Sequence, residues 1–172
     1  MALTGEQNYF EDFQPGQVFR HARGKTICEQ DNVGITLQVL NTAEGHFNED
    51  FMQKSGMGGR GWTSRLVFGG VTISMIIGLT MQDTGENALR ELGLDKIRLK
   101  APVFHGDTLY AFTEVLATEE SDLDDAGRVT FRHWGVNQDD TVVFEGERQV
   151  LIKRRSHKPL PSESQRSGGA SQ

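Results

Sequence analysis

Among the five histidines of the sequence, His46 has the setting of an acid–base group. Imidazole is the side chain that both accepts and donates a proton near neutral pH. Asn41 lies five residues before His46, and Gly69 and Gly70 offer backbone N–H groups further along the chain. The residues alone fit two interpretations: His46 is a general base, or it is a surface or helix-capping histidine.

The remaining histidines and the single cysteine are predicted to take no part in chemistry. His105 falls in a Phe-His-Gly-Asp turn and His133 within a strand pattern, so both are interpreted as structural, and His21 and His157 are expected to be exposed. Cys28 follows an isoleucine and is interpreted as a small core residue rather than a nucleophile.

Several classes of site are excluded by missing patterns. The sequence contains no GxGxxG, no Walker A and no GxSxG motif, and its histidines and carboxylates do not form a metal-ligand set. The five carboxylates of residues 119–127 are predicted to lie at a solvated hairpin tip. We therefore expect neither a cofactor nor a metal.

The length and net charge of the chain limit the number of domains and the classes of binding partner. A chain of 172 residues forms one domain by size. A net charge of -6 and a pI near 5.4 argue against nucleic acid or an anionic membrane as a partner. One cysteine allows no internal disulfide and fits a reducing compartment, and the first residues lack the pattern of a signal peptide, so a cytoplasmic protein is expected.

The element that must position this chemistry is the run from Val67 to Thr84. Residues 71–81 contain no charge, so a helix here must be surrounded by protein or lipid. The run is too short to cross a bilayer, which takes about 20 apolar residues. Gly69 and Gly70 stand at the predicted start of this helix, where N–H groups lack partners and carry a partial positive charge.

The elements before this helix are a strand at residues 17–22 and a helix from 27 or 28 to 40. Thr26 is predicted to cap that helix, with Glu29 completing a capping box. Its apolar face is predicted to comprise Val33, Ile35, Leu37, Val39 and Leu40. A short helix, residues 49–54, with Asn48 as its cap, and a glycine-rich connection at 55–64 follow.

Four strands follow the central helix, at residues 96–100, 109–118, 129–136 and 141–153, with a turn at 137–140. The order predicts an α+β fold in which an antiparallel sheet wraps around the central helix. We expect one domain over residues 8–155, a flexible N-terminus at 1–7, and a disordered tail at 156–172 that can be removed with little loss of stability.

Three segments of the sequence together resemble a known family. They are Asn41-Thr-Ala-Glu-Gly-His46-Phe-Asn48, Val67-Phe-Gly-Gly, and Ala101-Pro-Val-Phe-His-Gly-Asp-Thr-Leu109, with Asn137 in addition. From about Phe10 to Lys153 the chain resembles the MaoC-like dehydratases, which are (R)-specific enoyl-CoA hydratases with the hot-dog fold. It is most similar to the short itaconyl-CoA and mesaconyl-CoA hydratase branch.

The resemblance implies roles for single residues. His46 matches the catalytic histidine, Gly69 matches the glycine whose N–H binds the thioester oxygen, and Asn41 stands where the broader family has a catalytic aspartate. Glu44 stands where proline is usual, and Asn48 where aspartate is usual. The glycine-rich insertion before Val67 is longer than the family pattern, which affects the mouth of the pocket.

The implied activity is hydration and dehydration of a short enoyl-CoA thioester, with branched or carboxylated acyl groups as candidates. Arg60 and Arg65 are candidates to pair with a substrate carboxylate; the alternatives are solvated arginines or contacts to CoA phosphates. An unpaired edge strand in a single curved sheet predicts a homodimer, and the resemblance implies that the acyl-CoA site lies between its protomers. A hot-dog acyl-CoA thioesterase and a non-catalytic acyl-CoA-binding module remain as alternative functions.

Overall fold

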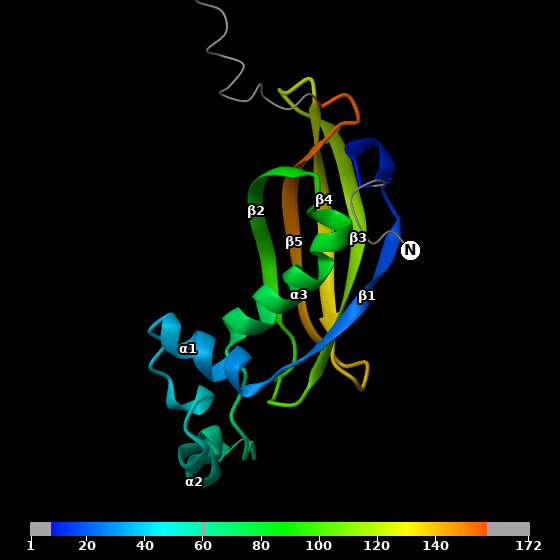
Figure 1. Ribbon diagram of the computed structural model, residues 1–172. Helices are drawn as coiled ribbons and strands as arrows, with labels where there is room; N and C mark the ends of the chain where they lie inside the picture. The colour runs from blue at the N-terminus through cyan, green and yellow to red at the C-terminus, as the bar shows by residue number, and fades with distance from the viewer. Residues whose placement is uncertain (1–7, 60, 158–172) are drawn as a thin grey trace, which may run out of the picture.

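A five-stranded antiparallel sheet curves around one long helix, as expected for a hot-dog fold (Figure 1). The computed structural model describes residues 8–59 and 61–157. The strands lie in the order β1-β3-β4-β5-β2, so β1 and β2 form the two edges. The expected N-terminal segment 1–7, Arg60, and the tail from residue 158 lie outside the described residues.

The first four strands are longer than the sequence pattern indicates, most of all β2, which pairs with β5 from Ala88 onward, whereas β5 matches the prediction to within one residue. Their bounds are β1 Val18–Thr26, β2 Ala88–Leu99, β3 Thr108–Glu120, β4 Ala126–Val136 and β5 Val142–Lys153. The helices are α1 Ile35–Gln38, α2 Glu49–Gly59 and α3 Gly69–Thr84. Short turns of 3₁₀ helix cover Phe10–Asp12 and Glu44–His46.

The core lies where α3 packs on the concave face of the sheet. Val71 and Ile76 of α3 are buried against Leu109, Ala111 and Phe144. Alternate residues of β3 are buried, as a half-buried strand requires. Removing such apolar surface from water is the main favourable term in folding, so this contact holds α3 against the sheet.

The approach of α3 to the sheet is close enough to require glycine. A Cβ at Gly135 on β4 would lie 2.2 Å from Cδ1 of Ile76, so no other residue fits there without a shift. On the side away from the sheet, however, Ser74 and Gly78 are exposed. The prediction that protein surrounds α3 therefore holds within one chain only for the face toward the sheet.

The helix predicted for residues 27–40 is present over residues 29–38, but it is not one regular α-helix. Residues Gln30–Gly34 form a π-helical turn, which is followed by the α-helical turn Ile35–Gln38. The wider turn rotates the following side chains, so the predicted apolar face is outside: Leu37, Val39 and Leu40 are 53%, 55% and 84% exposed. The buried side chains are instead polar, Asn32 and Thr36.

Two further local predictions fail at the same place. Thr26 belongs to β1, where its hydroxyl bonds the hydroxyl of Thr108, so it caps no helix. The carboxylate of Asp31 accepts the Cys28 backbone N–H at 2.8 Å instead. Cys28 itself is exposed rather than in the core. The cap predicted at Asn48 is confirmed, because its Oδ1 accepts the Phe51 N–H at 3.0 Å.

A row of buried polar side chains crosses the sheet beneath the C-terminal end of α3. His21, expected to be exposed, is 3% exposed; its Nδ1 lies 2.6 Å from Asp83 and its Nε2 2.7 Å from Thr113. The Thr113 hydroxyl also lies 2.8 Å from Nδ1 of His133. Since Nδ1–H of His21 donates to the carboxylate, the Thr113 hydroxyl donates to His21 and accepts from His133.

The row continues over β5 to β2. The Arg148 guanidinium is buried, donates to Glu91 at 2.5 and 2.8 Å, and donates to the Thr84 carbonyl at 3.1 Å. Nε2 of His133 is buried without a partner among the described residues. His133 is buried in the sheet, which is consistent with the structural role predicted for it, and the row includes side chains from all five strands.

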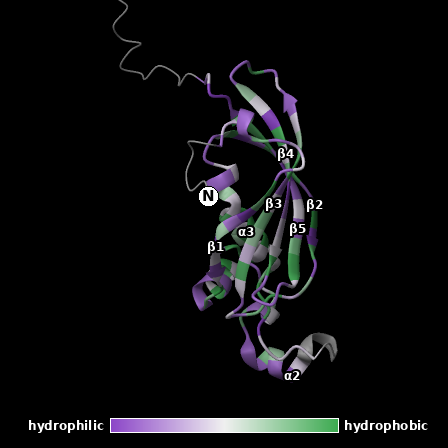
Figure 2. Ribbon diagram, turned by 90° about the vertical axis from the view of Figure 1, so that its right-hand side faces the viewer, coloured by the Kyte–Doolittle hydropathy of each residue, from purple (hydrophilic) through white to green (hydrophobic). Residues whose placement is uncertain are grey.

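Figures 1 and 2 both place α2 beyond one end of the sheet, on the side from which α3 starts. Within the described residues, no helix is long and apolar enough to span a membrane.

Candidate active site

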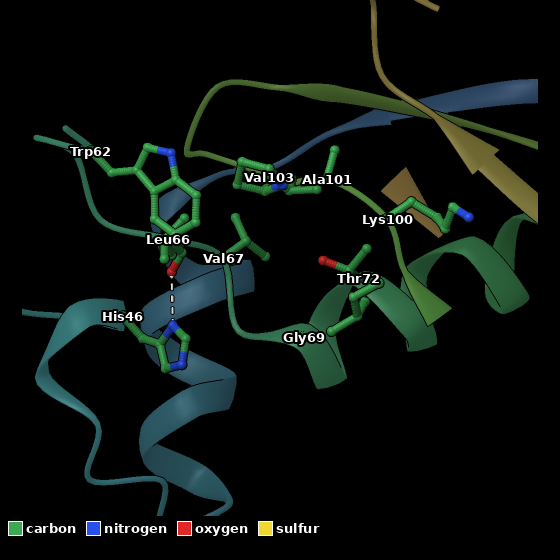
Figure 3. A pocket seen from close by; sticks show the side chains of 11 residues that line it. His46, Trp62, Leu66, Val67, Gly69, Thr72, Lys100, Ala101 and Val103 are labelled. Carbon is green, nitrogen blue, oxygen red and sulfur yellow. Dashed lines mark hydrogen bonds between the residues drawn. The ribbon is translucent and has the colours of Figure 1, made fainter. Parts of the chain in front are cut away.

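A pocket of about 410 Å³ opens at the N-terminal end of α3 (Figure 3). It is lined by His46, Trp62, Leu66, Val67, Gly69, Thr72, Leu99, Lys100, Ala101, Pro102 and Val103. Figure 3 shows His46 and Trp62 on one side of the pocket and Gly69, Thr72 and Lys100 on the other. Two of the sequence-derived site residues, His46 and Gly69, thus line one pocket.

The orientation of the His46 ring is set by a backbone acceptor. Nδ1 of His46 lies 3.0 Å from the carbonyl oxygen of Leu66. A carbonyl only accepts hydrogen bonds, so Nδ1 carries the proton in the neutral ring. Nε2 then presents its lone pair on the opposite edge of the ring, which is the arrangement a general base requires. The Phe68 ring packs against the imidazole, with centroids 5.6 Å apart.

The loop that carries His46 is held at both ends. The 3₁₀ turn Glu44–His46 forms because His46 N–H donates to the Ala43 carbonyl at 3.1 Å. Asn48 caps α2 directly after it. Leu66 N–H donates to Gly45 at 3.0 Å, so the segment that orients the imidazole also anchors its loop.

Gly69 is the first residue of α3, and Phe68 is its N-cap. The first N–H groups of a helix have no intrahelical acceptor and carry a partial positive charge. A Cβ at Gly69 would lie 2.5 Å from Cδ1 of Leu99, so glycine lets the helix start pass close to β2. This end of α3 offers backbone donors to an oxygen in the pocket.

Asn41 lies outside the pocket lining. Its Oδ1 accepts the Ala43 N–H at 3.0 Å, and its own N–H donates to the Thr36 carbonyl at 3.0 Å. The side chain thus stabilises the loop before His46 and leaves its Nδ2 group as a donor. Gly70 follows Gly69 on α3 but is not among the lining residues. Glu44 is exposed, and its carboxylate accepts from Asn48.

Arg65 is engaged in ion pairs. Its guanidinium binds both oxygens of Glu29, at 2.5 and 2.9 Å, and Glu49 at 2.9 Å. These hydrogen bonds raise the pKa of Arg65 and lower the pKa of Glu29. Arg65 is not among the pocket-lining residues, and Arg60 lies outside the described part of the chain.

Two residues near the site were not selected from the sequence. Lys100 is the cationic side chain among the described lining residues, with Nζ 3.3 Å from Glu145. Asn32 is 2% exposed, and its side chain bonds three backbone groups next to the pocket. Lysine at a strand end and asparagine in a helical segment are both common, so neither carries a sequence signal.

Comparisons with known proteins agree with this fold. A family model described as mesaconyl-CoA hydratase matches residues 2–154. A mesaconyl-CoA hydratase from Haloarcula marismortui is 35% identical over 163 residues, covering 88% of this chain and 44% of its own length. The chain thus spans less than half the length of that curated relative.

Comparison with solved structures supports the same fold and family. The crystal structure of a MaoC domain protein dehydratase from Chloroflexus aurantiacus superposes with a TM-score of 0.81 at 30% identity, covering 94% of this chain and 45% of that one. A Mycobacterium tuberculosis protein with a double hot-dog fold superposes at 0.74 with 22% identity, covering 95% of this chain and 51% of that one, which supports the fold alone. The chain has the hot-dog fold and belongs to the MaoC-like mesaconyl-CoA hydratase family.

Proposed function

We propose that the chain catalyses reversible hydration of a short enoyl-CoA thioester, and that the substrate carries a branched, carboxylated acyl group of the mesaconyl type. One observation carries the proposal: an imidazole with a fixed tautomer and the start of a helix line the same pocket. The family match supports the same reaction class.

The helix start supplies the electrophilic half of the mechanism. Adding water to a conjugated thioester places negative charge on the thioester oxygen as the β-carbon is attacked. The Gly69 N–H is proposed to donate to that oxygen, aided by the helix dipole. One such preorganised donor contributes on the order of 3 kcal/mol to the transition state.

His46 is proposed to supply the basic half. Its Nε2 accepts a proton from water while the water oxygen bonds to the β-carbon. The enolate is then protonated at the α-carbon, either by the His46 imidazolium or by a second group. Asn41 is an amide and cannot transfer this proton, so its proposed role is to hold the loop before His46 through Oδ1, with Nδ2 available as a donor to water.

The carboxylate of such a substrate needs a cationic partner. Arg65 would have to break its bonds to Glu29 and Glu49 to provide one. Lys100 lines the pocket, and among the described residues its ammonium group has one contact, to Glu145 at 3.3 Å, so it is the better candidate for a substrate carboxylate or a CoA phosphate.

The protomer is proposed to act as a homodimer. The edge strand β2 has exposed Leu89, Leu94, Ile97 and Leu99, and an exposed edge is normally paired or covered. The outer side of α3 is also uncovered at Ser74 and Gly78. A second copy of the chain is the proposed partner for these uncovered surfaces. A single monomeric species in sedimentation equilibrium at micromolar concentration would contradict the dimer.

A substrate assay tests the reaction. The protein is incubated separately with mesaconyl-CoA, itaconyl-CoA and crotonyl-CoA, and both enoyl absorbance and free thiol are followed. Loss of absorbance without thiol release is expected, fastest with mesaconyl-CoA. Thiol release would instead identify a thioesterase, and no change with any substrate would indicate a binding protein.

A further inference from the structure

Asn32 is a buried side chain with all its hydrogen bonds directed at the backbone around the pocket. Its Nδ2 donates to the His46 carbonyl at 2.9 Å and to the Leu66 carbonyl at 3.2 Å. Its Oδ1 accepts the Phe68 N–H at 2.9 Å. With 2% exposure, the amide is shielded from water, so each of these bonds is costly to lose.

The three backbone groups belong to the parts of the site that must be held relative to one another. One is the peptide of His46 itself. The second is the Leu66 carbonyl, which also accepts from the His46 ring at 3.0 Å and thereby fixes its tautomer. The third is the N–H of Phe68, the N-cap residue immediately before Gly69. One amide therefore connects the imidazole, its orienting carbonyl and the start of α3.

The chemistry of the contact is specific for asparagine. Two carbonyl acceptors and one N–H donor demand two donors and one acceptor, which a carboxamide provides. An ionised aspartate of the same shape would keep the bond to Phe68 but turn an oxygen toward the two carbonyls. Asn32 also lies within the π-helical turn Gln30–Gly34, and such turns occur often at functional sites.

We propose that Asn32 is a positioning residue that sets the tautomer and orientation of His46 relative to the helix start at Gly69. The inference rests on the proposed function of those two groups. Asn32 does not line the pocket, so it acts on the reaction through the backbone groups it binds.

Kinetics of Asn32→Asp provide the test, with Thr36→Val as the matched control. Thr36 lies four residues further along the same segment, is fully buried, and its hydroxyl has no partner among the described residues. Displacement of a catalytic group by about 1 Å costs roughly 100-fold. Asn32→Asp should therefore lower kcat by roughly 10- to 100-fold with KM changed less than about twofold. Thr36→Val should leave both unchanged.

A spectroscopic measurement separates positioning from loss of folding. The ¹⁵N shifts of the His46 ring, assigned by comparison with His46→Asn, should report the Nδ1–H tautomer in the wild type and a mixture in Asn32→Asp. If that variant does not fold, Asn32→Ser provides the same measurement with a smaller side chain. A purely structural residue would leave the His46 tautomer of the folded variant unchanged.

The outcomes distinguish this inference from the proposed function. Wild-type kcat and an unchanged tautomer in a folded Asn32 variant, with His46→Asn inactive, would overturn the positioning role alone. Full activity of His46→Asn would overturn the proposed function and this inference with it. Loss of kcat with the altered tautomer in Asn32→Asp, and neither in Thr36→Val, supports the proposal.

Discussion

Acidification should destabilise this protein through His133, which lies in the middle of the buried polar row. Burial is the main cause that lowers its pKa to about 3, and the nearby Arg148 and His21 act in the same direction. Burial also lowers the pKa of His21, although Asp83 opposes this. Both imidazoles are therefore neutral in the folded protein at pH 7.

The direction in which pH changes the free energy of unfolding follows from proton linkage. An unfolded chain protonates histidine near pH 6.5, whereas folded His133 resists protonation until about pH 3. Between these values the unfolded state binds more protons, so stability is fully present above pH 6.5 and falls as the pH decreases. At pH 5, about 1.5 pH units below the unfolded pKa, His133 alone removes about 2 kcal/mol of unfolding free energy.

Urea unfolding at pH 7.5 and pH 5.0, for the wild type and His133→Asn, measures this contribution. Asparagine keeps a donor near Nδ1 for the Thr113 hydroxyl but does not titrate. The wild type should lose about 2 kcal/mol more than the variant, while titrations common to both cancel. Equal losses would refute the reasoning. An NMR titration of the wild type gives an independent check: a His133 ring that protonates near pH 6 would also refute it.

Three further predictions concern the site. Gly69→Pro removes the proposed N–H donor, whereas Gly69→Ala retains it and makes the same Cβ contact to Leu99. The proline variant should therefore have a kcat roughly 100- to 1,000-fold below that of the alanine variant. Comparable kcat values would exclude the Gly69 N–H as the donor. Asn41→Ala should lower turnover with little effect on CoA binding. Asn41→Asp should stay active and move the acidic limb of the pH–rate profile to higher pH, because a carboxylate favours the imidazolium of His46. Inactivity of Asn41→Asp at every pH would show that the amide donor is needed. If Lys100 binds the acyl carboxylate, Lys100→Gln should raise KM for mesaconyl-CoA more than for crotonyl-CoA. If Lys100 binds a CoA phosphate, KM should rise equally for both substrates. An unchanged KM for both would show that Lys100 takes no part in binding.

The parts of the fold that follow from local pattern were predictable. The start of α3 at Gly69 is marked by paired glycines before an uncharged run, and residues 108–115 of β3 alternate between half-buried and buried. The position of His46 at a loop before a capped helix is equally local, because Asn48 caps α2 through its own side chain. These features depend on residues close together in the sequence.

The remaining features depend on contacts that periodicity does not encode. The π-helical turn at Gln30–Gly34 changes which side chains face inward, so an α-helical template assigned Leu37 and Leu40 to the core and left Asn32 unnoticed. His21 is buried because Asp83 and Thr113, distant in sequence, satisfy both ring nitrogens. The exposed apolar residues of β2 fit the proposed dimer, and their exposure depends on the folded arrangement rather than on local periodicity.

The most direct measurement of the central claim is mesaconyl-CoA hydration by His46→Asn. Asparagine can still donate to the Leu66 carbonyl, so the loop keeps its anchor while the basic nitrogen is lost. The account predicts a folded protein whose kcat is about 100- to 10,000-fold below that of the wild type. Wild-type turnover in the folded His46→Asn protein would contradict the account.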